Sequence, residues 1–247
     1  MHQVKLLCVA LSLSNLPFAG KTIENDAVNE TNHSFKLEES TMHSSITAAN
    51  ESILLNVPLV KQNPELRYGC EVTSLTMVLN YAGIEASKME LYKKIKKDSD
   101  PLIKKQGNIV KWGDPAVGFV GDMTGRNAGY AVFDKPMEDL VNAYLPNRAV
   151  NLTGKPFTHL ESHVKKGFPV VVWTTGDYRL PDRWESWEHK GKTIKTPLDL
   201  HAVVLVGYNK NFVFLNDPLS GRKNVRVDKH QFIQSWHALK SRAISYH

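Results

Sequence analysis

Apolar residues recur along the chain with two different spacings, and the change between them separates a helical part from a strand-rich part. Within residues 70–81, one face of the segment carries positions three or four apart: Val72, Leu75, Thr76 and Leu79. This spacing is typical of an amphipathic α-helix. A second helix is predicted over 88–97, because Ser87 and Glu90 form a capping-box pattern. Shorter helices are predicted at 136–144, 159–166 and 231–239.

The second half of the chain contains continuous apolar runs that predict buried β-strands. These runs are Phe168–Trp173, Leu200–Tyr208 and Phe212–Asn216, followed by a further strand at Arg222–Val227. Earlier in the chain, Pro58 limits the run 54–60 to a sheet edge or an irregular segment. Residues 106–130 are rich in glycine and predict a long loop, and the polar segment 178–197 predicts an inserted loop or ribbon. Helices early and antiparallel strands late indicate an α+β domain.

The amino-terminal residues have the layout of a secretory signal peptide. Lys5 supplies a positive charge, an apolar run extends from 6 to 13, and Ala19-Gly20 offers a small-residue cleavage site. An apolar tail that stays attached is the alternative. Residues 21–52 are polar and lack a sustained period, which predicts a disordered linker or a propeptide-like arm. We therefore expect a signal peptide at 1–20, this arm at 21–52 and one globular domain at 53–247.

Charge narrows the class of partner. The chain has a formal net charge of +6, and part of it is concentrated at Lys88, Lys93, Lys94, Lys96, Lys97, Lys104 and Lys105. A solvated helix face explains this cluster, and attraction to an anionic cell-wall polymer or to membrane headgroups is the functional alternative. The chain carries no nucleic-acid-binding motif, so a DNA or RNA partner is not expected. No apolar run reaches the ~20 residues of a membrane span, so no transmembrane segment is expected.

Removal of the signal peptide would also remove Cys8 and leave Cys70 as a lone thiol. A lone cysteine is either an inert buried residue or a reactive group. Cys70 falls in the first turn of the helix predicted at 70–81, directly after Gly69. Unpaired N–H groups and the positive end of the helix dipole favour an anion there. The sequence therefore predicts an exposed thiol with a stabilised thiolate.

The late hairpin offers this thiol a base. With a three-residue loop, Tyr208 pairs with Phe212, and Val203 then pairs with Asp217. His201 points to the same face as Val203, so Asp217 lies diagonally across from it, about 7–8 Å away. The carboxylate could hold the imidazole in one tautomer and stabilise its charged form. A core histidine bonded to a backbone carbonyl and an Asx-type turn cap are the alternatives for these two residues.

Other candidates carry weaker signals. Gln62, eight residues before Cys70, could donate an amide N–H to an oxyanion, and a surface glutamine is the alternative. Trp184 and Trp187 could form an aromatic wall of a substrate groove or a packed flap. A metal site needs histidines at a characteristic spacing from a second cysteine or from a pair of carboxylates. None of the following histidines shows such spacing: His159, His163, His189, His230 and His237. Neither a zinc site nor any other cofactor is therefore expected.

These segments together resemble the C39-like family of cysteine peptidases, in its secreted or surface branch found largely in Gram-positive bacteria. The resemblance covers about residues 54–240 and rests on Val57–Gln62, Gly69–Leu75, Gly113-Asp114-Pro115 with Phe119–Gly121, His201–Tyr208 and Asn216-Asp217-Pro218. It implies a papain-like fold, in which a helix that carries the cysteine packs on an antiparallel sheet. It also implies Cys70 as nucleophile, His201 as general base and acid, and Asp217 as the orienting carboxylate. Gln62 matches the oxyanion position.

The sequence thus predicts an exported cysteine hydrolase that is secreted or held at the surface of a Gram-positive cell. It would cleave a peptide or a related amide bond, including one in a cell-wall peptide, through an acyl-thioenzyme intermediate. A non-catalytic cell-surface or cell-wall binding module on the same fold is the main alternative. A structural or stress-related role is a third.

Overall fold

A seven-stranded sheet lies at the centre of the region that the computed structural model describes, residues 52–247. The strands run in the order β12-β11-β10-β7-β13-β6, with β1 added to β10, and every neighbouring pair is antiparallel. They are β1 (Ile53–Leu54), β6 (Ala149–Asn151), β7 (Val170–Thr175), β10 (Leu200–Tyr208), β11 (Phe212–Asp217), β12 (Arg222–Asp228) and β13 (Ala243–Tyr246). The predicted signal peptide and nearly all of the predicted arm lie outside the described residues.

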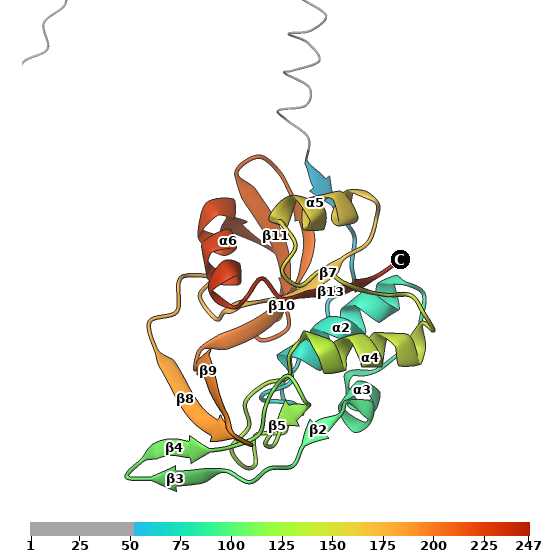
Figure 1. Ribbon diagram of the computed structural model, residues 1–247. Coiled ribbons are helices and arrows are strands. Elements are labelled where there is room, and N and C mark those ends of the chain that lie inside the picture. Colours follow the sequence, from blue (N-terminus) through green and yellow to red (C-terminus); the bar gives the residue numbers. More distant parts are fainter. Residues whose placement is uncertain (1–51) are drawn as a thin grey trace, which may run out of the picture. The chain divides into compact units, whose positions relative to one another are not determined.

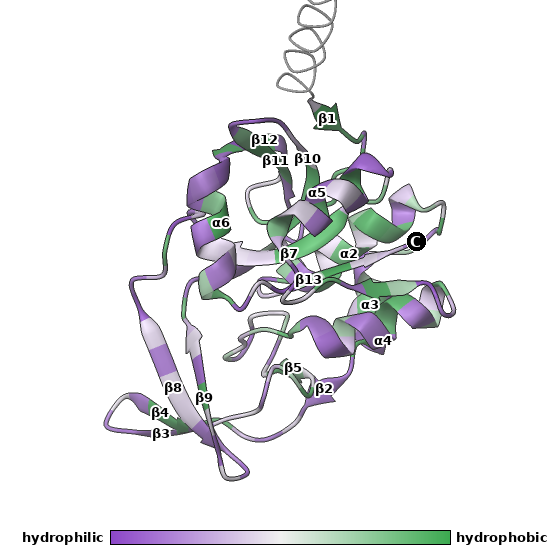
Figure 2. Cartoon of the chain, turned by 45° about the horizontal axis from the view of Figure 1, so that its top comes forward, coloured by the Kyte–Doolittle hydropathy of each residue, from purple (hydrophilic) through white to green (hydrophobic). Residues whose placement is uncertain are grey.

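Helices cover both faces of this sheet (Figure 1). One face packs against α2 (Cys70–Tyr81), α3 (Lys88–Lys94) and α4 (Asp134–Tyr144), and the other against α5 (Phe157–Lys165) and α6 (Lys229–Ala238). Successive side chains of β7 alternate between the two cores: Val171 and Trp173 join the first, and Val170 and Val172 join the second. Because β7 is buried on both faces, it begins with a continuous apolar run, whose valines are green in Figure 2.

A smaller sheet lies beside the main one. The hairpin of β8 (Trp184–His189) and β9 (Lys192–Pro197) joins β3 (Ile103–Lys105) and β4 (Asn108–Lys111) in four strands (Figure 1). Nearby, β2 (Lys97–Asp98) pairs in parallel with β5 (Phe119–Val120). A separate apolar cluster of Trp112, Val120 and Trp187 packs in this region. Since β9 is followed directly by β10, the hairpin precedes the strand that carries His201.

Several sequence predictions are confirmed, and the differences have local causes. The helix at 70–81 is present, as is the Ser87–Glu90 capping box, but α3 ends at Lys94 because Ile95 adopts an extended conformation. The predicted ribbon at 178–197 is the β8–β9 hairpin. The prediction of one long loop at 106–130 is wrong in part, because that segment contains β4 and β5.

The predicted edge run at 54–60 is a strand only at its first residue, where β1 pairs with β10. Two short strands, β6 and β13, were not predicted because each has four residues or fewer and no clear alternation. Among the described residues, no helix has both the length and the apolar character that crossing a membrane requires.

Candidate active site

The loop before α2 is fixed so that Cys70 opens the helix. The backbone N–H of Gln62 donates to the carbonyl of Pro218, 3.0 Å away, which ties this loop to the end of β11. Gly69, the residue before the helix, packs directly on Leu66, since a Cβ at position 69 would lie 2.5 Å from the Cβ of Leu66. Only glycine allows this approach without moving the chain.

Helix α2 is fastened to β10 beside the candidate histidine. The hydroxyl of Ser74 donates to the carbonyl of Ala202, 3.1 Å away. Burial raises the pKa of the Cys70 thiol, and the backbone of Ala202 acts in the opposite direction on it. His201 pairs across the sheet with Thr174 and is buried. These contacts place the thiol next to the backbone of the histidine strand.

His201 and Asp217 form a buried ion pair. Nε2 of His201 lies 2.7 Å from Oδ1 of Asp217, and the other carboxylate oxygen accepts hydrogen bonds from the hydroxyls of Tyr178 and Ser220. The N–H of Leu219 donates to Oδ1 as well. Burial raises the pKa of Asp217, but the hydrogen bond and charge of His201 outweigh it and hold the pKa well below its usual range. Asp217 is therefore ionised and hydrogen bonds to the imidazole as a carboxylate.

The register that brings this pair together contains a β-bulge. The pairing of Tyr208 with Phe212 is wrong, because Tyr208 pairs with Val213 instead. A register shift between Leu205 and Gly207 then restores the expected offset, and Val204 pairs with Asn216. The diagonal placement of His201 and Asp217 is confirmed because the bulge lies between the turn and the site.

The surroundings of the thiol differ from the sequence prediction. Cys70 is only 7% exposed and belongs to the apolar core, so the expected exposed thiol is wrong. Its Sγ donates to Oε2 of Glu71, 3.3 Å away, and the N–H of Val132 donates to the other oxygen of that carboxylate. Burial and then the charge of Glu71 raise the pKa of Cys70 well above its ordinary value. At this site the rise in the Cys70 pKa caused by desolvation therefore exceeds the fall expected from the helix N-terminus.

Glu71 is itself perturbed. Burial raises the pKa of this carboxyl group to about 7, although the N–H of Val132 acts in the opposite direction. The sequence analysis missed Glu71 as a functional residue, although it directly follows the candidate nucleophile. It also missed Tyr178 and Ser220, which reach Asp217 from an irregular segment and a turn.

Cys70 and His201 open onto one cavity of about 720 Å³. Gln62 lines it too, and its Nε2 donates to the carbonyl of Arg67, 2.8 Å away. The remaining lining residues are Asn63, Pro64, Arg67, Tyr68, Thr124, Tyr130, Gly176, Leu198, Asp199, Leu200 and Leu219. The structure thus brings the three predicted residues Cys70, His201 and Gln62 to one cavity, with Asp217 behind His201.

The two tryptophans do not line this cavity. Trp184 is 44% exposed on β8, and Trp187 is buried against Trp112 and Tyr130. The indole N–H of Trp187 donates to the carbonyl of Gly113, 2.8 Å away. Trp187 therefore anchors the hairpin, and the aromatic side chains that line the cavity are Tyr68 and Tyr130.

One histidine departs from the sequence expectation about metals. His189 lies beside Asp98 and Asp100, two carboxylates more than eighty positions earlier in the chain. The expectation that none of the histidines meets a carboxylate pair is wrong for this residue. No local spacing could reveal the cluster, because β8 and β2 come together only in the fold.

Comparisons with known proteins agree on a relationship across the whole described domain. The profile of the Peptidase_C39 like family matches residues 54–244. The uncharacterized protein YvpB of Bacillus subtilis (strain 168) is 34% identical over 253 residues, which span 99% of this chain and 98% of YvpB. A Bacillus anthracis crystal structure provisionally described as a C39-like peptidase superposes with a TM-score of 0.74 at 41% identity, covering 80% of this chain and 98% of that one. All three matches cover the domain that holds Cys70 and His201. The chain therefore belongs to the C39-like peptidase family.

Proposed function

We propose that this chain is an exported cysteine peptidase with a papain-like catalytic arrangement. In it, Cys70 is the nucleophile, His201 the general base and acid, and Asp217 the orienting carboxylate. The observation that carries the proposal is that a buried histidine–carboxylate pair, 2.7 Å apart, opens onto the same cavity as the cysteine at the start of α2. Because Asp217 binds Nε2, the other ring nitrogen, Nδ1, is left to exchange a proton with the thiol.

The chemistry needs no cofactor. As the thiol proton moves to Nδ1 of His201, Sγ of Cys70 forms a bond to the carbonyl carbon of the scissile amide. The imidazolium then gives that proton to the departing amine nitrogen as the C–N bond breaks. Water, deprotonated by the neutral imidazole, attacks the thioester and releases the acid and the free thiol. Asp217 stays ionised throughout and stabilises the imidazolium.

In the resting geometry the thiol proton points at Glu71 rather than at the histidine. Catalysis therefore requires the thiol to turn about its Cα–Cβ bond toward His201 when substrate enters. The raised pKa of Cys70 means that the thiol is the resting form. Proton transfer then accompanies attack, because no thiolate is formed in advance.

Two donors suit the oxyanion. The first N–H groups of a helix have no intrahelical acceptor, so the backbone N–H of Cys70 is available at the start of α2. The amide of Gln62 lies in the same cavity and carries two N–H bonds, of which one is directed at Arg67. We assign the other to the oxyanion.

The cavity also favours a type of substrate. Asp199 lines it, and one of its carboxylate oxygens is buried without a hydrogen-bond partner among the described residues. Burial, followed by the charges of Asp182 and Asp177, raises the pKa of Asp199. Although Arg67 lines the cavity as well, this carboxylate oxygen of Asp199 offers an acceptor to a basic side chain or a free amine of a bound peptide. We therefore propose amino-bearing peptides, including cell-wall peptides, as the substrate class.

The signal-peptide layout of the sequence supports export, and the excess of lysine in α3 and its neighbours supports attraction to an anionic cell-surface polymer. Fractionation of cells into cytoplasm, wall and medium tests the location directly. Recovery of the unprocessed chain from the cytoplasm would contradict export.

Digestion of an unbiased peptide library and of peptidoglycan, followed by mass spectrometry, tests the activity. We expect cleavage products from the wild-type chain and none from Cys70→Ala or His201→Ala, whereas Glu85→Gln, an exposed control far from the cavity, should cleave normally. If the wild type cleaves nothing but still retains one of these ligands on a column, the binding-module alternative is favoured. If Cys70→Ala cleaves as well as the wild type, the nucleophile is assigned incorrectly.

A further inference from the structure

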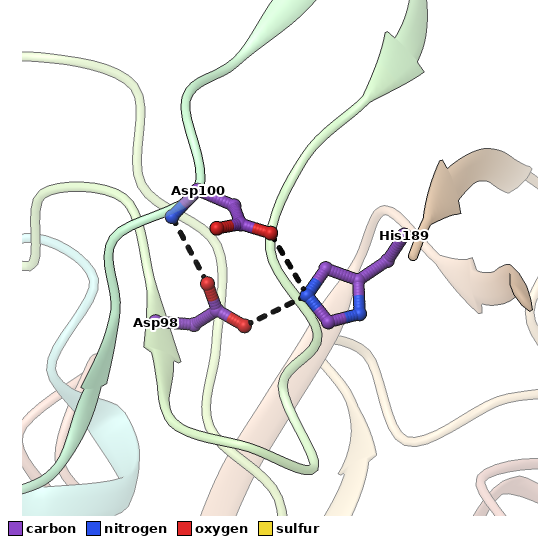
Figure 3. A group of neighbouring side chains, drawn as sticks. All are labelled: Asp98, Asp100 and His189. Carbon is purple, nitrogen blue, oxygen red and sulfur yellow. Dashed lines mark hydrogen bonds and ion pairs between the residues drawn. The ribbon is translucent and has the colours of Figure 1, made fainter. Parts of the chain in front are cut away.

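Three side chains from separate parts of the chain converge at the turn end of the β8–β9 hairpin. Asp98 ends β2, Asp100 follows two residues later, and His189 ends β8 (Figure 3). One oxygen of each carboxylate lies 3.1 Å from Nε2 of His189. One donor atom from each residue lies within 4.8 Å of the other two. Both carboxylates thus point at the same ring nitrogen.

The histidine nitrogen lacks a hydrogen-bond partner. His189 is 6% exposed, and neither oxygen lies in a direction that gives its Nε2 a hydrogen bond. A protonated imidazole that simply paired with one carboxylate would align its N–H with that oxygen. A buried ring nitrogen with two oxygens at equal distance and no hydrogen bond has the arrangement of ligand atoms around a common ion.

The spacing between these atoms suits coordination. Ligands bound at about 2.1 Å lie about 3.0 Å apart at a right angle and about 3.4 Å apart at the tetrahedral angle. The observed 3.1 Å between nitrogen and each oxygen falls inside this range. The structure therefore needs little rearrangement to admit an ion.

The carboxylates are held ready by the backbone. The N–H groups of Asp100 and Asp114 donate to the two oxygens of Asp98, at 3.0 and 3.1 Å. Gly113 lies against the same carboxyl group, since a Cβ there would come within 3.0 Å of its Cγ. Such support for a ligating carboxylate is typical of metal sites.

The coordination positions that these three side chains would leave free face a second cavity. Asp98 and Asp100 line a pocket of about 460 Å³, and the side chain of Asp100 is 36% exposed. Lys190 lies 3.3 Å from Asp100, but its side chain is 68% exposed and free to swing outward when an ion enters. Water could complete the coordination from this pocket.

We propose that Asp98, Asp100 and His189 bind a divalent transition-metal ion of the Zn²⁺ or Mn²⁺ class. One imidazole nitrogen with two carboxylate oxygens suits these ions better than Ca²⁺, which prefers oxygen ligands alone. The ion would link β2 to the end of β8. Because the β8–β9 hairpin leads into β10, this link would restrain the segment that enters the active-site cavity at Leu198.

Isothermal titration of the chelator-treated full chain at pH 7.5, with ZnCl₂, MnCl₂ and CaCl₂ in turn, tests the site. We expect one Zn²⁺ or Mn²⁺ per chain and weaker binding of Ca²⁺. Asp100→Asn removes a ligand oxygen from a partly exposed position, and His189→Gln removes the nitrogen. Each should bind the ion at least about tenfold more weakly. His230→Ala, which removes an exposed histidine on α6, should bind it as the wild type does.

Thermal unfolding gives a second readout that is independent of peptidase activity. Saturating Zn²⁺ should raise the unfolding midpoint of the wild type by about 5 °C or more and leave that of Asp100→Asn unchanged. Circular dichroism of Asp100→Asn checks that this variant is folded. Absence of stoichiometric Zn²⁺ or Mn²⁺ binding would overturn the proposal. It would mean that the three side chains form only an ion pair. Equal binding by Asp100→Asn, or tighter binding of Ca²⁺ than of Zn²⁺, would also overturn it.

Discussion

Replacement of Glu71 by glutamine should make Cys70 more reactive. The carboxylate accepts the thiol hydrogen bond at 3.3 Å, and both side chains are buried. Glutamine has the same shape and can still accept the N–H of Val132, which bonds the carboxylate at 3.0 Å. Its NH₂ group would then face Sγ and donate to a thiolate instead of repelling it. The pKa of Cys70 should therefore fall in Glu71→Gln.

The geometry sets the size of this effect. At pH 8 the Glu71 carboxyl, with a pKa raised to about 7, is mostly ionised. Two unit charges 3.3 Å apart repel by about 5 kcal/mol at an effective dielectric constant of ~20, which corresponds to at most about 4 pKa units for the thiol. The open cavity reduces this figure, so we take about 2 to 4 units. Because a thiolate of lower pKa is a weaker nucleophile, the net gain in rate is about ten- to a hundredfold.

Reaction of the thiol with a small disulfide reagent that releases a coloured product measures this rate, and Cys70 is the only cysteine of the described residues. The control Glu85→Gln removes an exposed charge and should react as the wild type does. At pH 6, where Glu71 is already protonated, the difference between Glu71→Gln and the wild type should shrink. A folded Glu71→Gln that reacts no faster than the wild type at pH 8 would refute the reasoning.

Three further measurements, two of them on other substitutions, test separate parts of the structure. Asp217→Asn should reduce kcat about a hundredfold or more with little change in KM, because the imidazolium loses its charged partner. Steady-state kinetics on a cleaved peptide measures this change, and a normal kcat would exclude the orienting role. The raised pKa of Glu71 predicts that the free energy of unfolding of the wild type falls by on the order of 3 kcal/mol between about pH 4.5 and 7. Glu71→Gln should remove most of this pH dependence, and denaturant unfolding across that range checks it. Gly207→Ala should destabilise the domain by about 1–3 kcal/mol, because the new Cβ would lie 2.2 Å from the carbonyl oxygen of Ile53; an unchanged unfolding midpoint would mean that β1 moves aside freely.

Local patterns were sufficient for the parts of the site that lie within one element. The helix at 70–81 follows from its apolar spacing, and the hairpin follows from two apolar runs and a short loop. The bulge between Leu205 and Gly207 could not be predicted, because it depends on β1 crossing at Gly207, whose Cβ position is occupied by Ile53. The prediction of the His201–Asp217 pair succeeded because this bulge offsets the error at the turn.

The environment of the thiol could not be predicted for a different reason. The helix dipole is a property of the helix alone, so the sequence suggests a stabilised thiolate. Burial is a property of the assembled domain, and here Cys70 is packed within the core that α2 shares with the sheet. The N–H of Val132 that holds Glu71 beside the thiol comes from 61 positions away. Desolvation, which comes from contacts distant in the sequence, therefore affects the pKa of Cys70 more than the local helix dipole does.

The two carboxylates of the site differ in a way that separates their roles. Several donors, including His201, surround Asp217, and its pKa is held well below the usual range, so its charge is constant across physiological pH. Glu71 is buried with one backbone donor and a thiol, and its pKa is raised to about 7, so its charge changes near neutrality. Environments that move two pKa values apart commonly separate two functions. In the proposed mechanism Asp217 thus orients the base at all relevant pH values, whereas protonation of Glu71 lowers the electrostatic cost of forming the thiolate. A proton taken up by Glu71 below pH 7 partly compensates for the lower hydroxide concentration, so thiol reactivity should depend less steeply on pH in the wild type than in Glu71→Gln.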